Sequence, residues 1–449
     1  MHTEKMWLPA TPSSVTGRIN HAVVIAVALP SVLPLVLADV LVCPDSCWCD
    51  SGDTKSIAVC WDHNLTRIPQ YFDKQLQEIA LMFNSITVIN DYAFHGLSNV
   101  SIMLLQYNGI REVHEQAFDG LVNLTYLDLS HNKIVKIPPT VIRNNEKLDF
   151  LYLNHNEISI LGPFLFSVSL SVLDISFCKI TFLPHDAFIG TPNLMKLKIN
   201  DNHITEFEIY AFRGLRKLEA LNCGNNLIKG LNSNLFFGLD DLKYVDFSNN
   251  SISVISPRLF AYNRKLRYLF LKNNSLSIPN TGPILISESL SHLDISFCNI
   301  TSISSEAFIN LTNLTSLRMI GNPLRHLNTK AMEPLNKLQV ILFGPDASCS
   351  ESSLKNIFKY FQQKSVSYYA PPLCSIDSAV TKPTIFYSSH PSPTMPPSQI
   401  LQTNISDIIF HSKHPPSISN SSQLKVLVHV THEHTILILA VSCILKICR

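Results

Sequence analysis

Apolar residues recur at a fixed spacing through the centre of the chain. The pattern L-x-x-L-x-L-x-x-N/C-x-L appears as LTYLDLSHNKI at residues 124–134 and as LRYLFLKNNSL at residues 266–276. Successive repeats are 24 residues apart, except for one step of 22 residues between Asn156 and Cys178. Such a period indicates a solenoid, in which each repeat stacks on its neighbours. The Asn or Cys of the pattern, here called position 0, falls at Asn84, Asn108, Asn132, Asn156, Cys178, Asn202, Asn226, Asn250, Asn274, Cys298 and Asn322.

The alternation just before position 0 predicts one short strand per repeat. Residues at positions −5 and −3 point into a core, so those at −6, −4 and −2 face the opposite side. The Asn side chain can satisfy buried backbone groups where the chain leaves the strand. Cys178 and Cys298 occupy the same position, and we interpret them as small buried thiols rather than redox centres. Phe and Gly in segments such as 117–121 and 211–215 are expected to pack between layers and to allow a tight turn.

These repeats resemble the leucine-rich-repeat family, in its 24-residue extracellular type, over roughly two thirds of the chain. The resemblance implies a horseshoe. We therefore expect an α/β-type solenoid with a parallel β-sheet on the concave side and a mostly irregular convex side. Residues 76–346 are assigned to eleven repeats and one degraded repeat.

Cysteines flank the repeats on both sides. Four of them, spaced C-P-x-x-C-x-C-x10-C from Cys43 to Cys60, define an N-terminal cap at residues 39–75. They indicate two disulfides, with a zinc site as the competing interpretation. The resemblance implies the pairs Cys43–Cys49 and Cys47–Cys60. At the other end, Cys349 and Cys374 predict one disulfide in a reduced cap at residues 347–374, which includes a helical stretch at 352–363.

The two termini carry targeting signals. Residues 1–38 are interpreted as a secretory signal peptide, the alternative being an N-terminal membrane anchor. Residues 375–423 are rich in Ser, Thr and Pro and read as an extended stalk. Residues 424–449 form a hydrophobic segment that fits a lipid-anchor signal, with a short transmembrane segment and free secretion as alternatives. We therefore expect an extracellular protein, at the cell surface or secreted.

The net charge and the motifs argue against several classes of function. The 35 basic and 34 acidic residues leave a net charge of +1, which gives no case for nucleic acid as a partner. No nucleophile–base motif, metal-ligand motif or phosphate-binding glycine loop is recognisable, so we expect no enzyme, no cofactor and no metal. The His429 to His434 cluster could ligate a metal but lies in the anchor segment.

Asn-x-Ser/Thr acceptors support a heavily glycosylated exterior. Those at Asn99, Asn123 and Asn313 take equivalent places before strands and should share one flank. The full set is Asn64, Asn99, Asn123, Asn249, Asn273, Asn299, Asn310, Asn313, Asn404 and Asn420.

The concave positions of the strands provide a candidate ligand surface. Aromatic and cationic side chains, which are enriched in binding hot spots, fall there at Tyr126, Phe150, Tyr152, Lys196, Lys198, Tyr244, Tyr268 and Phe270. The alternative is plain cross-strand packing of good strand formers. Recurring Asp/Ser pairs, such as Asp128 with Ser130, are interpreted as family background rather than a calcium or catalytic row.

The predicted function is recognition or cell adhesion at the cell surface. The partner would be a protein, in a contact that could be homophilic, or a glycan, with the membrane reached through the C-terminal segment. The alternative is a soluble pattern-recognition or matrix-binding protein. Both rest on analogy with the family.

Overall fold

The computed structural model describes residues 42–51, 55–160, 167–344 and 352–369. The predicted signal peptide, stalk and anchor segment, the pair Cys349 and Cys374, and the acceptors Asn404 and Asn420 all lie outside these residues. Among the described residues, no helix is both long and apolar enough to cross a membrane.

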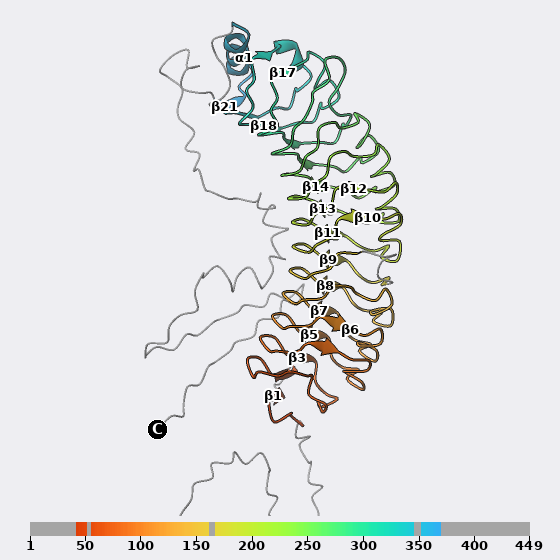
Figure 1. Ribbon diagram of the computed structural model, residues 1–449. Helices are drawn as coiled ribbons and strands as arrows, with labels where there is room; N and C mark the ends of the chain where they lie inside the picture. Colours follow the sequence, from red (N-terminus) through yellow and green to blue (C-terminus); the bar gives the residue numbers. More distant parts are fainter. Residues whose placement is uncertain (1–41, 52–54, 161–166, 345–351, 370–449) are drawn as a thin grey trace, which may run out of the picture. The chain divides into compact units, whose positions relative to one another are not determined.

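One sheet of 15 strands runs through the repeats, with one strand per turn (Figure 1). All pairs in it are parallel except β1 with β2, which is antiparallel. The strands are, in order, β1 (Trp48–Ser51), β2 (Ser56–Val59), β3 (Glu78–Ala80), β5 (Ile102–Leu104), β7 (Tyr126–Asp128), β8 (Phe150–Tyr152), β9 (Val172–Asp174), β11 (Lys196–Lys198), β13 (Ala220–Asn222), β14 (Tyr244–Asp246), β15 (Tyr268–Phe270), β16 (His292–Asp294), β18 (Ser316–Met319), β20 (Val340–Phe343) and β21 (Ser367–Tyr369).

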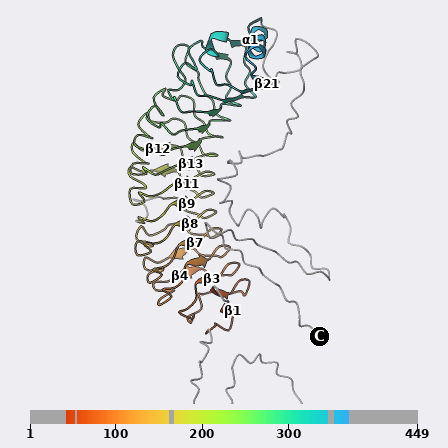
Figure 2. The ribbon, with the colours of Figure 1, turned by 180° about the vertical axis from the view of Figure 1, so that it is seen from behind.

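The side opposite this sheet is mostly turns, with three short parallel pairs (Figures 1 and 2). These pairs join β4 (Val88–Ile89) to β6 (Glu112–Val113), β10 (Phe182–Leu183) to β12 (Glu206–Phe207), and β17 (Ser302–Ile303) to β19 (His326–Leu327). The structure confirms the predicted leucine-rich-repeat horseshoe. In the described part of the chain, helix occurs only near its C-terminal end, as η1 (Thr329–Ala331) and α1 (Ser352–Gln363).

The core is built from the apolar positions of the repeat. Leu124, Leu127, Leu129 and Ile134 are all at most 1% exposed, and their counterparts in other turns are buried in the same way. Behind them runs a column of phenylalanines, in which Phe188, Phe212, Phe236 and Phe260 stack at ring-centroid distances of 6.1, 6.0 and 5.0 Å. Each turn thus covers the apolar side of the next, because no single turn can bury its own.

A ladder of asparagines at position 0 joins adjacent turns. Asn132 Nδ2 donates to the carbonyls of Leu105 and Leu129, both at 3.0 Å. Its Oδ1 accepts from the backbone N–H of Ile110 at 3.1 Å. Where Cys298 replaces Asn, its Sγ lies 3.2 Å from the Leu271 carbonyl oxygen. The buried backbone groups that leave each strand are therefore paired, as expected for this residue type.

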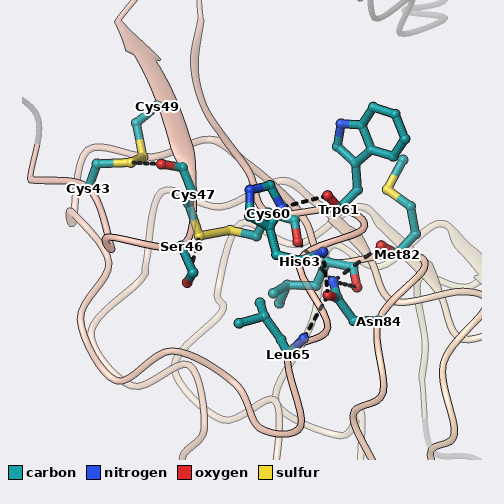
Figure 3. The surroundings of a disulfide bond; sticks show 11 residues. Cys43, Ser46, Cys47, Cys49, Cys60, Trp61, His63, Leu65, Met82 and Asn84 are labelled. Atoms are coloured by element: carbon teal, nitrogen blue, oxygen red, sulfur yellow. Dashed lines mark hydrogen bonds between the residues drawn. A yellow bond between two sulfur atoms is a disulfide. The ribbon is translucent and has the colours of Figure 1, made fainter. Parts of the chain in front are cut away.

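Caps cover the first and last described turns. Disulfides join Cys43 to Cys49 and Cys47 to Cys60, which are the pairs that the family resemblance implied (Figure 3). Asn84 Oδ1 accepts from the backbone N–H groups of His63 and Leu65 at 3.1 and 3.0 Å, which fixes the cap to the first repeat. At the other end, Phe358 and Phe361 of α1 are buried against Phe343 of the degraded repeat.

Candidate ligand-binding face

The register of the main sheet places equivalent residues side by side. Tyr126 pairs with Phe150, and Tyr244 pairs with Tyr268, all at position −6. Lys196 lies in the same column, and Tyr152, Lys198 and Phe270 lie in the neighbouring column at position −4. The sheet thus sorts the eight predicted residues into two columns on one face. The residues at −5 between them, such as Leu151, are buried in the core.

The first aromatic cluster lies on β7 and β8. The Tyr126 ring is 6.0 Å from Phe150 and 5.3 Å from Tyr152, measured between ring centroids. All three side chains are partly exposed. Burial raises the pKa of Tyr126 well above its usual range, and the nearby carboxyl of Asp128 adds to this shift. The Tyr126 hydroxyl therefore stays protonated and can donate a hydrogen bond to a ligand at any physiological pH.

The second aromatic cluster lies on β14, β15 and β16. Tyr244 is 6.5 Å from Tyr268 and 5.3 Å from Phe270 between ring centroids. His292 stacks on Tyr268 at 4.6 Å, a residue that the sequence prediction missed although it falls at position −6. Phe270 is only 9% exposed, so most of its ring serves packing within the cluster. The solvent-accessible part of this cluster comes from Tyr244, Tyr268 and His292.

Two lysines on β11 lie between the clusters. Lys198 Nζ is 3.2 Å from Asp174 Oδ2, and that carboxyl is almost completely buried. Burial lowers the pKa of Lys196, and the positive charge of Lys198 lowers it further, against the opposing effect of Glu219. Lys198 is thus held by a buried acid, while partial burial makes the charged form of Lys196 less favourable.

The Asp/Ser pairs have a structural role in the sheet. Asp128 Oδ1 accepts from the backbone N–H of Ser130 at 2.9 Å, and Asp246 and Asp294 make the same bond to Ser248 and Ser296 at 2.8 and 2.9 Å. Asn222 makes it to Gly224 at 3.0 Å, so a charge is not required. Burial raises the pKa of Asp128 to about 6. No group of three or more His, Cys, Asp or Glu side chains suited to a metal ion occurs among the described residues.

Apart from these two clusters, a column of aromatic residues borders the sheet face at position −1, just after each strand ends. Phe83, Tyr107, His131, His155 and Phe177, here called the ring stack, lie nearly parallel in five successive turns. The centroid distances are 4.7, 4.2, 4.0 and 4.3 Å, and the interplanar angles are 7 to 15°. All five residues have positive φ, between 51 and 57°. This column was not predicted from the sequence, although position −1 of successive repeats carries the ring-bearing residues.

Five of the predicted glycan acceptors fall on two sides of the solenoid. Asn99, Asn123 and Asn313 are equivalent, because each side-chain amide donates to a backbone carbonyl 25 residues earlier. By contrast, Asn249 and Asn273 occupy the same position as the ring stack, and Asn273 Nδ2 donates to Asn249 Oδ1 at 2.9 Å. Neither side overlaps the columns of the two aromatic clusters.

The repeats match the model of the leucine rich repeat family at residues 74–134, 123–167, 168–228, 221–276 and 288–342. These matches cover more than half of the chain. The chain therefore belongs to the leucine-rich-repeat family. Proteins of this fold are generally binding scaffolds without enzymatic activity, which agrees in general terms with the sequence prediction. No curated protein matches the chain.

Two solved structures are similar to this fold. TLR13, in its complex with the RNA ssRNA13, shares 23% identity at a TM-score of 0.51 over 63% of this chain. A leucine-rich-repeat protein of Leptospira interrogans shares 21% identity at a TM-score of 0.50, over 68% of this chain and 82% of its own. The region of TLR13 that matches this chain is 45% of the TLR13 chain. At these identities the similarity establishes the fold alone.

Proposed function

We propose that this protein is an extracellular recognition protein, displayed at the cell surface, that binds a protein ligand through the face of its main sheet. The observation that carries this proposal is the pair of aromatic clusters in register on one face, with Lys196 and Lys198 between them. Tyr and other aromatic residues dominate interface hot spots because they bury much area with few rotatable bonds.

Cross-strand packing alone accounts less well for the composition of this face. Strand formers such as Val and Ile serve packing at least as well as Tyr, and they have no polar group to keep hydrated. Tyr126, Tyr152, Tyr244 and Tyr268 remain partly exposed in their columns. A row of half-buried tyrosines beside cations is instead the composition of a contact surface that is covered on binding.

The extracellular and membrane-bound parts of the proposal rest on the sequence of the termini and on the two disulfides of the N-terminal cap. Disulfides persist in oxidising compartments. Glycosylation at the predicted acceptors follows from the same location. The absence of a nucleic-acid partner remains a prediction from the near-zero net charge.

The first experiment is expression of the full-length chain in animal cells, with an epitope tag after Ala38. Surface staining is measured before and after treatment with a phosphatidylinositol-specific phospholipase. Release into the medium is the expected result for a lipid-anchored protein, whereas retention identifies a transmembrane segment. A bare surface with tagged protein already in the medium would contradict surface display and leave a soluble recognition or matrix protein.

The second experiment addresses the ligand. Beads coated with the secreted repeat-bearing protein are tested for self-aggregation and for binding to cells that display a panel of extracellular proteins. Saturable binding to one partner, or homophilic aggregation, is expected. Binding of polyuridylate or heparin, with no protein partner bound, would contradict a protein ligand.

A further inference from the structure

The ring stack, together with the cations beside it, suggests the chemistry of a partner. We propose that this strand-end edge, in the turns from Asn84 to Cys178, binds an extended acidic segment of a partner protein. The inference rests on the proposed function, because it assumes a protein ligand. It adds a second contact surface, next to the sheet face, with a ligand class of its own.

The geometry of the stack determines what the rings can offer. Tyr107, His131 and His155 each have a neighbouring ring on both sides, at 4.0 to 4.7 Å. Their ring faces are therefore covered, yet all three residues are partly or largely exposed. The exposed part of these rings is consequently their edge. Aromatic edges carry partial positive charge and attract carboxylate and carbonyl oxygens, as well as the faces of other rings.

The residue types are not those that the backbone prefers at this position. Residues other than Gly, Asn and Asp are strained when φ is positive. The following turns meet this preference with Asp201, Asn225, Asn249 and Asn273, at φ values of 53 to 56°. In the first turns, by contrast, five rings hold the same conformation. Stacking between neighbouring rings offsets part of this strain, but Asn would have met the folding requirement without any stacking.

Positive charge lies beside the stack. Arg111, Lys133 and Lys179 follow position 0 by one to three residues, so they flank the same edge. Glu157 is the acid within this group; its carboxylate pairs with Lys179 at 2.9 Å and also interacts with Lys133 and Arg111. Three cations thus surround one carboxylate, and the edge keeps a net positive charge. Such a charge attracts an anionic ligand over about 8–10 Å at physiological salt.

The acceptor positions leave this edge uncovered. On the strand-end side, Asn64 precedes the stack by one turn, and the next acceptor is Asn249. Asn99 and Asn123, which lie in the turns of the stack, are on the strand-start side. Glycans at these positions would leave the ring stack open to a protein partner.

An acidic peptide fits this edge better than other anions do. Single-stranded nucleic acid binds proteins by stacking its bases on aromatic faces, and the faces of the inner rings are covered. A sulfated glycan would use the cations but gains nothing specific from the ring edges. Carboxylates and aromatic side chains of an extended peptide can use both, the first against the cations and the second across the ring edges.

The test measures binding of a random copolymer of glutamate and tyrosine to the immobilised full-length protein at physiological salt. Heparin and polyuridylate serve as comparison anions. The first variant replaces rings by the residue that later turns use: Tyr107→Asn, His131→Asn and His155→Asn together. The second removes charge, with Arg111→Ser and Lys133→Ser. The matched control is Lys229→Ser, an exposed cation at the place of Arg111 in a later turn.

The expected result is saturable copolymer binding that each test variant weakens about tenfold or more and that the control leaves unchanged. Heparin and polyuridylate should bind more weakly, and the ring variant should not affect their binding. No copolymer binding, or binding unchanged in both test variants, would overturn the inference. Equal ring-dependent binding of either comparison anion would overturn the peptide assignment.

The charge variant keeps the test decisive if the ring variant folds poorly, because Arg111 and Lys133 are surface residues. The proposed function fails separately, when no protein partner is found in the cell panel. If a partner is found and its binding depends on the sheet clusters but not on the ring stack, the proposed function holds and this inference fails.

Discussion

The turns from Asn84 to Cys178 and those from Asn202 to Asn274 have the same backbone conformation at position −1, but they carry different residue types there. Both regions place the residue at position −1 in the left-handed region of φ. The later turns use Asp or Asn there, which tolerate this conformation, and two of those asparagines, Asn249 and Asn273, lie in Asn-x-Ser motifs. The earlier turns use rings that stack on one another. The same position therefore supports an aromatic edge in one region and a polar edge with two predicted glycan acceptors in the other.

This contrast separates what the fold requires from what it permits. Every turn needs the buried leucines and the Asn or Cys at position 0, because each contacts the neighbouring turns. Position −1 carries no such requirement, since Asp201 and His131 adopt nearly the same φ. Differences at this position thus report on the surface rather than on the core.

The largest effect is expected in the phenylalanine column, which also differs between the regions. Phe236→Ala should lower the free energy of unfolding by about 3–5 kcal/mol, because Phe236 is fully buried and contacts Phe212, Phe247 and Phe260. Phe118→Ala should cost less, since the next turn carries Ile142 instead of Phe. Chemical denaturation of both variants checks the order, and a larger loss at Phe118 would refute it.

A smaller effect is expected from exchanging residue types at position −1. Asn225→His should destabilise by about 1 kcal/mol, because His loses the conformational tolerance of Asn and has no ring beside it to stack on. His131→Asn should change stability by about 1 kcal/mol or less, because lost stacking and relieved strain oppose each other. Denaturation curves of the two variants test this. Equal losses at both positions would show that stacking contributes nothing.

The ring stack should also make stability depend on pH. Burial, with the neighbouring His155, lowers the pKa of His131 to about 4, from 6.5 in the unfolded chain. The folded state therefore binds this proton less readily, and stability is lost as pH falls from about 6.5 to 4. Asp128 acts in the opposite direction, since its raised pKa of about 6 adds stability as pH falls through that value.

The contribution of His131 is isolated by comparing the wild type with His131→Asn across this range, since Asp128 is common to both. The melting temperature of the wild type should fall more steeply below pH 6.5. Parallel curves for the two proteins would be inconsistent with a depressed pKa at His131.

The smallest effect on stability is expected from the acceptors. Ser251→Ala and Ser275→Ala remove the acceptor motifs of Asn249 and Asn273 without altering position −1, and each should increase electrophoretic mobility by one glycan. Little change in the melting temperature is expected, because both serine side chains are exposed. Introducing an acceptor within the stack, by His131→Asn together with Lys133→Thr, should decrease mobility. If wild-type mobility is insensitive to glycosidase, the glycan part of the contrast is wrong.

The fold could be predicted well from the sequence because the repeated residues are the ones that form the buried core. The spacing of buried leucines and of Asn132 and its counterparts determines strand position, register and turn direction, and all of these can be read from one chain. Disulfide pairing in the N-terminal cap followed from the family resemblance rather than from the spacing.

The candidate site was predicted less completely. Alternation within a strand identified the columns of Tyr126 and Lys198, but it could not show that Phe270 is almost covered or that Lys198 pairs with Asp174. Those facts depend on contacts between turns. The ring stack was missed because position −1 lies beyond the strand, where alternation no longer indicates which way a side chain points.

The most direct test of protein recognition by the sheet face measures the affinity for the partner found in the cell panel. It compares the wild type with two variants, each altered in one aromatic cluster. Tyr126→Ser with Tyr152→Ser changes the first cluster, Tyr244→Ser with Tyr268→Ser changes the second, and Tyr262→Ser alters an exposed tyrosine outside the sheet as a control. We expect at least about a tenfold loss of affinity in a cluster variant and none in the control, with all proteins folded. Unchanged binding in both cluster variants would contradict recognition through the sheet face.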